Sequence, residues 1–557
     1  MNAEAVTEVG ARRRHGAWRA LASLLALAGC EAPAPPETNG ETAAPAFEVR
    51  QLVFSIDPSE VVTVGDELLA EGRRLYGRRC ASCHGTRGRG DGPAAYLLYP
   101  KPRNFHRGPF RFGSSWGGEP TDEDLFRVIS RGIPGSAMPS WAHLTERKRW
   151  ALVHYVKSFS QYPIELADEE TVERGEGRIG VPVEPANTAD SIARGAALFR
   201  EACVKCHGPT GKGDGKSAFT LEDDDGVPIR PRDLTTGVFK GPRTPADLYR
   251  RIIGGIPGTP MPDHGDTYFG DDAWHLVHFV MSLSSDVLRE RAEMKRYCIP
   301  VVRVEHLPDH PDAGTWTRIP SVDLHLMPLW WRYNRPEYVT VRAAHDGKEL
   351  ALQLVWADDT TDDLVIRPQD FRDAAAVELA PFDSDPPFFA MGETGRFVNI
   401  WMWKAERQAD LKGYNDLEAQ YPNIGIDSYP NLQNSPYEQP MRHALTLESD
   451  RAFITAWGAG NIVADPTRRS AGEDLAAQGF GTLKARDTQQ VRIDHAIHSQ
   501  GTYRVTFRRS LNGEGEHSVD MNPGSTVLAA FAIWNGDAGD RDGKKSVSIW
   551  QELAIQP

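Results

Sequence analysis

The sequence predicts a multidomain protein in which two all-α domains are followed by an all-β sandwich domain. The chain has 557 residues, which is too long for one ordinary hydrophobic core. Between about residues 60 and 285 it repeats itself with an offset of 123 residues. Beyond Cys298 the apolar residues change from a helical spacing to the alternation of strands. The repeat and this change of pattern place the domain boundaries.

The N-terminal segment, residues 1–29, has the form of a bacterial lipoprotein signal peptide. Arginines precede an apolar run that ends at Ala28 and is too short to span a membrane. The string Leu27-Ala-Gly-Cys30 resembles a lipobox, so we expect Cys30 to be lipidated. The alternative is an ordinary cleavage site with an incidental cysteine. Residues 30–59 are the expected tether, because their first half is rich in Pro, Ala, Glu and Thr.

The overall charge argues against nucleic acid as a partner. The formal net charge is −14, and no block of basic residues follows the leader. Binding to phosphates requires a basic face, which this sequence does not offer.

Two copies of Cys-x-x-Cys-His predict two covalently bound haems. The first is Cys80-Ala-Ser-Cys83-His84 and the second is Cys203-Val-Lys-Cys206-His207. Each pair of thiols can add to the two vinyl groups of a haem, and the adjacent histidine then lies beneath the iron. A thioredoxin-like or zinc motif is the alternative, but neither requires the histidine that follows both copies.

A methionine is the expected sixth ligand of each iron. Met138 and Met261 each follow their motif's histidine by 54 residues, and each precedes a proline. Methionine is a common axial ligand that raises the reduction potential of haem. His154 and His278, at equivalent places in the two copies, are the alternative ligands.

The repeated segments, residues 60–165 and 186–286, are each long enough for a core of their own. A glycine and an aromatic residue four positions apart lie on one face of each first helix, and a small residue there would let the last helix cross closely. The matched stretches are Gly72–Tyr76 with Gly195–Phe199, Gly132–Gly135 with Gly255–Gly258, and Trp150–Val156 with Trp274–Val280.

Together with the haem motifs, these features resemble class I cytochrome c. The resemblance implies that the haems are attached outside the cytoplasm, so we expect a protein anchored by lipid on the periplasmic side of the envelope. Arg103 and Arg232, in the loops between motif and methionine, are candidates to pair with haem propionates. Equally, each could be an ordinary surface arginine. Cys298 has no assignment and is expected to act as a small buried hydrophobic residue.

The last segment, residues 299–557, predicts an antiparallel β-sandwich. Short alternating stretches are separated by Gly, Asp, Asn and Pro, and Asp346-Gly347 marks a hairpin turn. The expected strands are 338–342, 350–356, 376–379, 397–403, 452–457, 503–507, 527–534 and 547–550.

Two runs in this domain, 389–404 and 532–550, resemble the gamma subunits of ethylbenzene dehydrogenase, dimethylsulfide dehydrogenase, and chlorate and selenate reductases. The resemblance implies a b-type haem held by Met391 and Lys545, in a subunit that serves a molybdopterin enzyme. Strand alternation places Lys545 on one face with Val547 and Ile549, and Lys544 on the other. The alternative is that Met391 packs a loop and both lysines are solvated.

These patterns predict a multihaem electron-transfer protein with two c-type haems and one b-type haem. Its expected partners are a molybdopterin oxidoreductase or a respiratory chain, and six-coordinate irons would leave no catalytic site for substrate. A dihaem oxidase or peroxidase with a substrate-binding sandwich is one alternative. A cytochrome with a carbohydrate-binding or protein-binding module is the other.

Overall fold

The computed structural model describes residues 48–107, 110–160, 170–171, 177–412, 420–421, 423, 456, 459–465, 468–493 and 495–557. The leader, the predicted lipidation site Cys30 and all but one residue of the strand expected at 452–457 lie outside these ranges. The described residues all belong to one compact unit.

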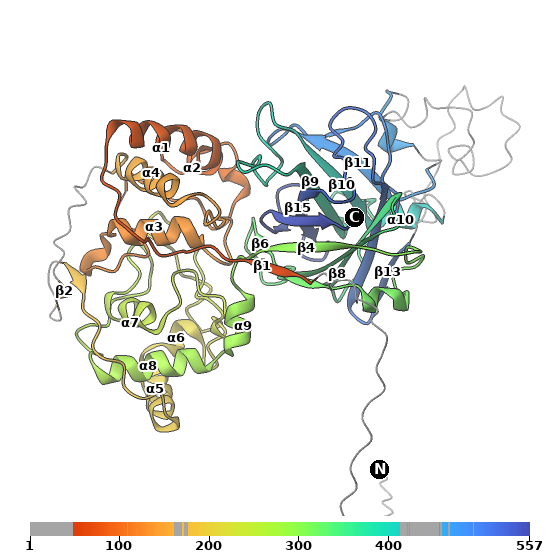
Figure 1. Ribbon diagram of the computed structural model, residues 1–557. Helices are drawn as coiled ribbons and strands as arrows, with labels where there is room; N and C mark the ends of the chain where they lie inside the picture. Colours follow the sequence, from red (N-terminus) through yellow and green to blue (C-terminus); the bar gives the residue numbers. More distant parts are fainter. Residues whose placement is uncertain are drawn as a thin grey trace, which may run out of the picture. The chain divides into compact units, whose positions relative to one another are not determined.

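The first repeat contains four α-helices and two short 3-10 helices. Thr121 and Thr145 cap the helices that follow them by accepting backbone N–H bonds. Figure 1 shows the first and last helices lying side by side. The helices are α1 (Asp66–Arg79), α2 (Ala81–His84), η1 (Ala95–Leu97), η2 (Trp116–Gly118), α3 (Asp122–Arg131) and α4 (Glu146–Lys157).

The second repeat has the same order of α-helices, with threonine caps at Thr188 and Thr244. In both copies the first helix crosses the last at its glycine. A Cβ on Gly72 would overlap the carbonyl oxygen of Ala151, and one on Gly195 would overlap that of His275. The helices are α5 (Ala189–Ala202), α6 (Val204–His207), η3 (Leu234–Thr236), α7 (Pro245–Gly254) and α8 (Asp271–Ser282). This confirms the predicted close crossing at both glycines.

Between the repeats, β2 (Glu170–Thr171) and β3 (Arg178–Ile179) form a parallel pair. Helix α9 (Asp286–Arg291) follows the second repeat and leads into the sheet.

The C-terminal segment forms a large mixed sheet. Its main path runs β12-β11-β10-β9-β15-β17-β4-β7-β8-β14-β13. The strands are β1 (Arg50–Leu52), β4 (Arg296–Arg303), β5 (Val322–His325), β6 (Met327–Pro328), β7 (Tyr338–His345), β8 (Glu349–Ala357), β9 (Ala374–Pro381), β10 (Val398–Lys404), β11 (Gly472–Ala477), β12 (Lys484–Ala485), β13 (Ala496–Ser499), β14 (Thr502–Ser510), β15 (Thr526–Trp534), β16 (Ser546–Val547) and β17 (Gln551–Ile555). Short helices accompany them: η4 (Gly314–Arg318), α10 (Ala405–Asp410) and η5 (Ile462–Ala464).

The expectation of a purely antiparallel sandwich was wrong in one respect. The hairpin at Asp346-Gly347 is confirmed, since β7 and β8 pair antiparallel across it. However, β4 pairs parallel with both β17 and β7. Strand β17 lies beside β4 and runs in the same direction. Because the two strands are distant in sequence, no short turn joins them, and no local turn signal predicts the pairing. Residues 50–52, expected in the tether, form β1 and pair with β4.

The sheet curls so that its two halves face each other across one core. Trp356 of β8 and Trp403 of β10 lie 6.0 Å apart by ring centre, and Tyr503 of β14 lies 5.4 Å from Trp403. A contact between strands so far apart in the sheet order requires two layers. All three aromatic side chains are buried, as expected for a sandwich interior.

A second apolar core joins the first repeat to the outer face of the sheet. It includes Tyr76 and Trp141 from the helical repeat and Phe388, Trp534 and Trp550 from the sheet domain. The rings of Trp141 and Phe388 stack at 6.2 Å. Together these contacts hold the first haem motif against the segment that carries Met391.

Candidate haem sites

Both Cys-x-x-Cys-His motifs and both candidate methionines line a single cavity. Its volume is about 860 Å³, and much of its wall is apolar. From the first repeat it includes Cys80, Cys83, His84 and Met138, and from the second Cys203, Cys206, His207 and Met261. The structure therefore brings all eight predicted c-type haem residues to the wall of one cavity, four from each repeat.

The first histidine is oriented for iron binding by a backbone partner. His84 Nδ1 lies 3.1 Å from the carbonyl oxygen of Arg103, and the ring stacks on Phe105 at 4.7 Å. Burial lowers the pKa of His84, so the imidazole is neutral and Nδ1 donates its proton to this carbonyl. The lone pair on Nε2 then remains for a metal, which is the usual arrangement of a ligand histidine.

The second histidine is half-buried and also neutral. Burial, with a smaller contribution from His264, lowers the pKa of His207 to about 4. Its Nδ1 atom has no hydrogen-bond partner among the described residues. The two copies thus differ in how the ring is fixed, although both histidines line the cavity.

The four motif cysteines are free thiols in half-buried positions. Burial raises the pKa of Cys80 to about 12 and that of Cys203 to about 11. A thiol with a raised pKa is a weak nucleophile, so Cys80 and Cys203 lack the low pKa of a reactive redox cysteine. Their place in the cavity wall suits thioether attachment to a haem.

The methionine loops have the same backbone pattern in both repeats. The amide of Ile133 donates to the carbonyl of Met138 at 3.0 Å, and that of Ile256 to Met261 at 3.1 Å. The alternative ligands lie outside the cavity wall. His154 Nε2 bonds the carbonyl of Val62 at 2.7 Å, and His278 Nδ1 lies 2.6 Å from the hydroxyl of Ser191. This geometry favours methionine over these two histidines at both sites.

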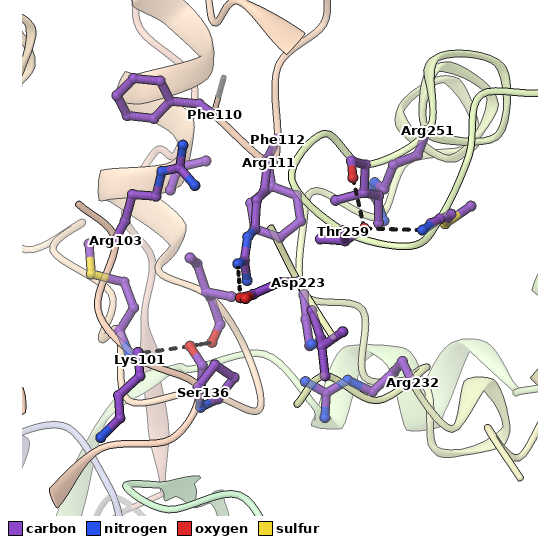
Figure 2. Close-up of a pocket in the computed structure, with 18 of the residues that line it drawn as sticks. Lys101, Arg103, Phe110, Arg111, Phe112, Ser136, Asp223, Arg232, Arg251 and Thr259 are labelled. Carbon is purple, nitrogen blue, oxygen red and sulfur yellow. Dashed lines mark hydrogen bonds and ion pairs between the residues drawn. The ribbon is translucent and has the colours of Figure 1, made fainter. Parts of the chain in front are cut away.

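The polar part of the cavity wall is strongly basic (Figure 2). Burial, then neighbouring Arg232 and Arg111, lowers the pKa of Lys240 to about 7. Burial lowers the pKa of Arg232 to about 9, with Arg335 adding to the effect. Buried cations of this kind require anionic partners, and carboxylates match the guanidinium fork. The wall contains Lys101, Arg103, Arg111, Arg232, Lys240 and Arg251. It therefore fits the propionates of haem, which are carboxylates.

Met391 and Lys545 come together at one buried carboxyl group. The backbone amide of Met391 donates to Oε2 of Glu378 at 3.2 Å, and Lys545 interacts electrostatically with the same carboxylate. Burial raises the pKa of Glu378 to about 8 and lowers the pKa of Lys545, whose Nζ lies 4.7 Å from the centre of the Trp534 ring. Met391 has a φ of 74°, a left-handed conformation that is uncommon outside glycine.

The two adjacent lysines differ as the strand pattern predicts. Lys544 is exposed, with its Nζ 5.3 Å from the centre of the Trp330 ring, whereas Lys545 is half-buried beside Trp534 of the second apolar core. The predicted separation of faces is incomplete, because Ser546, Ser548 and Trp550 are buried as well. Oε1 of Glu378 is buried without a hydrogen-bond partner among the described residues, so this carboxyl oxygen can still form a hydrogen bond. These features place Met391 and a lysine of lowered pKa beside the same carboxyl group.

Comparison with known families follows the same division of the chain. The ethylbenzene dehydrogenase family matches residues 315–546, and the subunit III family of cbb3-type cytochrome c oxidase matches residues 67–156 and 190–280. The chain joins two cytochrome c domains to an ethylbenzene dehydrogenase gamma-like domain. Haem is therefore the cofactor type that both the motifs and the families indicate.

Individual relatives each match part of the chain. A Haloferax mediterranei protein, named as a respiratory nitrate reductase heme subunit, is 24% identical over 46% of this chain and 73% of its own length. The dimethylsulfide dehydrogenase subunit gamma of Rhodovulum sulfidophilum is 24% identical over 45% of this chain and 78% of its own. A chain in the reducing HAO-like complex of Kuenenia stuttgartiensis is 39% identical and wholly covered by 42% of this chain, with a TM-score of 0.36.

The structure also identifies residues that sequence reasoning missed. Arg78 and Arg79, directly before Cys80, bind Asp385 on the segment that leads to Met391 at 2.6 Å each. Both also pair with Glu393, two residues after Met391. The first cytochrome domain and the Met391 segment of the gamma-like domain are therefore clamped together. A pair of arginines beside a haem motif was the available signal, but only the fold shows what they bind.

Two further features complete the description. Cys298 lies half-buried on β4, paired between β1 and β17. Within the described ranges, no helix is both long and apolar enough to cross a membrane.

Proposed function

We propose that this chain is a multihaem electron-transfer protein that carries two c-type haems in its cytochrome domains and one b-type haem in its gamma-like domain. One observation supports it above all: two complete sets of two cysteines, a histidine and a methionine line the same cavity, whose polar wall is basic. Haem, when bound, supplies the one-electron redox change. The residues of the chain bind it, fix its axial ligands and exclude water.

Each set of residues has a defined task in this proposal. Cys80 and Cys83 would form thioethers, and His84 would ligate iron through Nε2 while its Nδ1–H donates to the carbonyl of Arg103. Met138 would supply the second protein ligand of this haem. The second repeat supplies Cys203, Cys206, His207 and Met261 in the same order.

Full coordination of each iron by two protein side chains favours electron transfer over catalysis. An oxidase or peroxidase requires an open iron position, and each set here provides two axial candidates. Met391 and Lys545 would provide the third pair. A lysine can bind iron only as the neutral amine, and burial already lowers the pKa of Lys545.

The proposed partner is a molybdopterin oxidoreductase or another respiratory redox protein. Support comes from the relatives, whose names describe subunits of nitrate reductase, dimethylsulfide dehydrogenase and chlorate reductase. We further propose that Cys30 is lipidated and holds the protein on the periplasmic side of the membrane. The sequence of the leader supports this part of the proposal.

Haem content tests the proposal directly. The full-length protein, matured in its native host, is extracted with acid-acetone, and pyridine haemochrome spectra then count covalent and extractable haem. We expect two haems to remain on the chain and one to be extracted. Two covalent haems with none extractable would remove the b-type site and leave the gamma-like domain as a binding module. Carbon monoxide binding by the resting reduced protein would favour the oxidase alternative.

Lysine variants locate the extractable haem. Lys545→Ala should lose or loosen only this haem, because it removes a ligand beside Trp534 and Glu378. Lys544→Ala is the matched control, since its side chain is exposed and one position away. Equal haem content in the two variants would show that Lys545 is not the ligand.

A further inference from the structure

Each cytochrome domain extends an arginine to the methionine loop of the other. Arg232, in the second domain, donates from Nη2 to the carbonyl oxygen of Gly135 at 3.2 Å. A Cβ on Gly135 would lie only 2.7 Å from Nη1 of the same arginine, so the guanidinium packs directly on this backbone. Gly135 lies three residues before Met138, the expected iron ligand of the first domain.

The first domain makes a similar but looser approach, since the guanidinium of Arg103 also donates to the carbonyl of Arg107 in its own domain. A Cβ on Gly258 would have Nη1 of Arg103 at 3.8 Å, and Gly258 lies three residues before Met261. The backbone of Arg103 meanwhile accepts the hydrogen bond of His84. This one residue therefore contacts the histidine of its own domain through its carbonyl and approaches the methionine loop of the other domain with its side chain.

Charged contacts between the two cytochrome domains help to keep Arg103 and Arg232 in these positions. Arg111 of the first domain pairs with Asp223 of the second at 2.6 Å, as the dashed line in Figure 2 shows. Asp223 belongs to a turn in which Ile229 bonds back to Leu221. The second domain has six more residues between its haem motif and Pro231 than the first has before Pro102, and this turn lies within the longer segment.

A further contact between the domains is made just before the methionine loop of the first domain. Arg131, in the last turn of α3, binds Glu293 beyond the second domain at 2.6 Å and also bonds the carbonyl of Phe239. The side chain of Arg131 is nearly buried, so this pair is shielded from salt. The contact between the two domains therefore includes a shielded ion pair as well as exposed ones.

The guanidinium of Arg232 can donate further hydrogen bonds besides the one to Gly135. Its Nε and Nη1 atoms are buried and have no hydrogen-bond partner within the described part of the chain. Both belong to a side chain in the wall of the cavity that also contains Met138 and Met261. Buried donors of this kind call for an acceptor in the cavity, and a haem propionate is an acceptor of matching shape and charge.

We propose that Arg232 and Arg103 are cross-domain positioning residues: each binds a propionate in the shared cavity and holds the methionine loop of the opposite domain. The inference rests on the proposed function, since it requires haem at both motifs. Its consequence is specific. Methionine ligation in the first domain depends on a side chain from the second, and the reverse holds for Arg103.

The sign of the effect follows from charge and ligation. Oxidised haem carries one more positive charge than reduced haem, so loss of a nearby cation stabilises the oxidised form. Loosening the Met138 loop weakens a ligand that raises the potential. Both effects lower the potential of the first-domain haem, although the mutated residue belongs to the second domain.

The test is a spectroelectrochemical titration of haem-loaded full-length protein carrying Arg232→Leu. Each haem signal is assigned beforehand with Met138→His and Met261→His. We expect the reduced-to-oxidised ratio of the first-domain haem to fall about tenfold at fixed potential, about 59 mV for one electron, and its methionine–iron band to weaken. Arg232→Lys restores the charge and should recover most of the shift. Arg194→Leu is the control, because it removes an exposed second-domain arginine paired with Asp272.

The outcomes separate this inference from the proposed function. Covalent haem is counted in every variant, and absence of haem from the unmodified protein would refute the function itself. Two haems with a shift confined to the second domain would overturn the cross-domain inference. If the Arg232→Leu protein fails to take up haem, the Arg103→Leu variant tests the same inference with the two domains exchanged. It must then lower the potential of the second-domain haem, and an unchanged value there would overturn the inference.

Discussion

Replacing Gly72 by alanine should destabilise the first cytochrome domain, because this glycine marks the point where α1 crosses α4. A Cβ at this position would overlap the carbonyl oxygen of Ala151 and lie 2.8 Å from Cβ of Tyr155. Carbon atoms pack best at about 3.5–4.0 Å, so the helices would have to separate by roughly 1 Å. The obstacle is backbone and a Cβ atom, neither of which can rotate away.

The magnitude follows from two opposing effects. Alanine in place of glycine within a helix gains about 1 kcal/mol of intrinsic propensity. Overpacking a tight contact costs about 1–3 kcal/mol, and rigid neighbours place this site at the upper end. Gly77 lies on the same helix with nothing within 4 Å of its Cβ position, so Gly77→Ala should only gain. Both variants gain this propensity, so it cancels, and we expect them to differ by the overpacking cost alone, about 2–3 kcal/mol in unfolding free energy.

Urea titration of the haem-loaded protein measures the difference. The methionine–iron band of the first domain reports on the α1–α4 contact, and that of the second domain serves as an internal reference. Gly195→Ala should reproduce the effect in the second domain, where a Cβ would overlap His275 and lie 2.8 Å from Cβ of Phe279. Equal midpoints for Gly72→Ala and Gly77→Ala would refute the reasoning, because propensity alone would then explain both.

Three further predictions concern ligands, anchoring and pH. Met138→Ala or Met261→Ala should keep the covalent haem but lose its methionine–iron band and lower its potential; an unchanged spectrum would mean that another residue is the ligand. Cys30→Ser should release exported protein from the membrane fraction, since lipid supplies the anchor, and persistent membrane association would show that a partner holds it. Burial, and to a lesser extent nearby arginines, lowers the pKa of His325 to about 3. The neutral imidazole therefore stabilises the fold above the pKa of the unfolded chain, near 6.5, and this stabilisation is lost as the pH falls. From pH 6.5 to 4.5 this loss is about 2–3 kcal/mol, and His325→Asn, which keeps a donor for the carbonyl of Ala292, should flatten the urea midpoint over that range.

Local patterns were sufficient to predict the parts of the molecule that depend on neighbouring residues. The glycines at 72 and 195 predicted a helix crossing because only a missing Cβ permits one so close. The alternation in 338–356 predicted the β7–β8 hairpin, since the turn at Asp346-Gly347 lies within the same stretch. In both cases a short sequence pattern is enough to indicate the contact that forms.

Features that depend on distant segments left no such pattern. The parallel pairing of β17 with β4 joins residues some 250 positions apart, and nothing in either strand specifies the direction of its partner. Glu378 was missed although it is a lone carboxylate in an apolar strand. That signal shows that the group needs a partner, but not that the partner lies beside Met391 and Lys545.

The interface between the cytochrome domains shows why the repeat itself was misleading. Superposing the two copies assigns Arg103 and Arg232 to the same place. In the structure each of these arginines lies near the methionine loop of the other copy, because a residue on the facing surface of one copy meets the other copy. The longer turn at Asp223 then breaks the symmetry, since it pairs with Arg111 in one direction only. A duplicated sequence can thus indicate the candidate residues of both sites and still not show which residues connect the two copies.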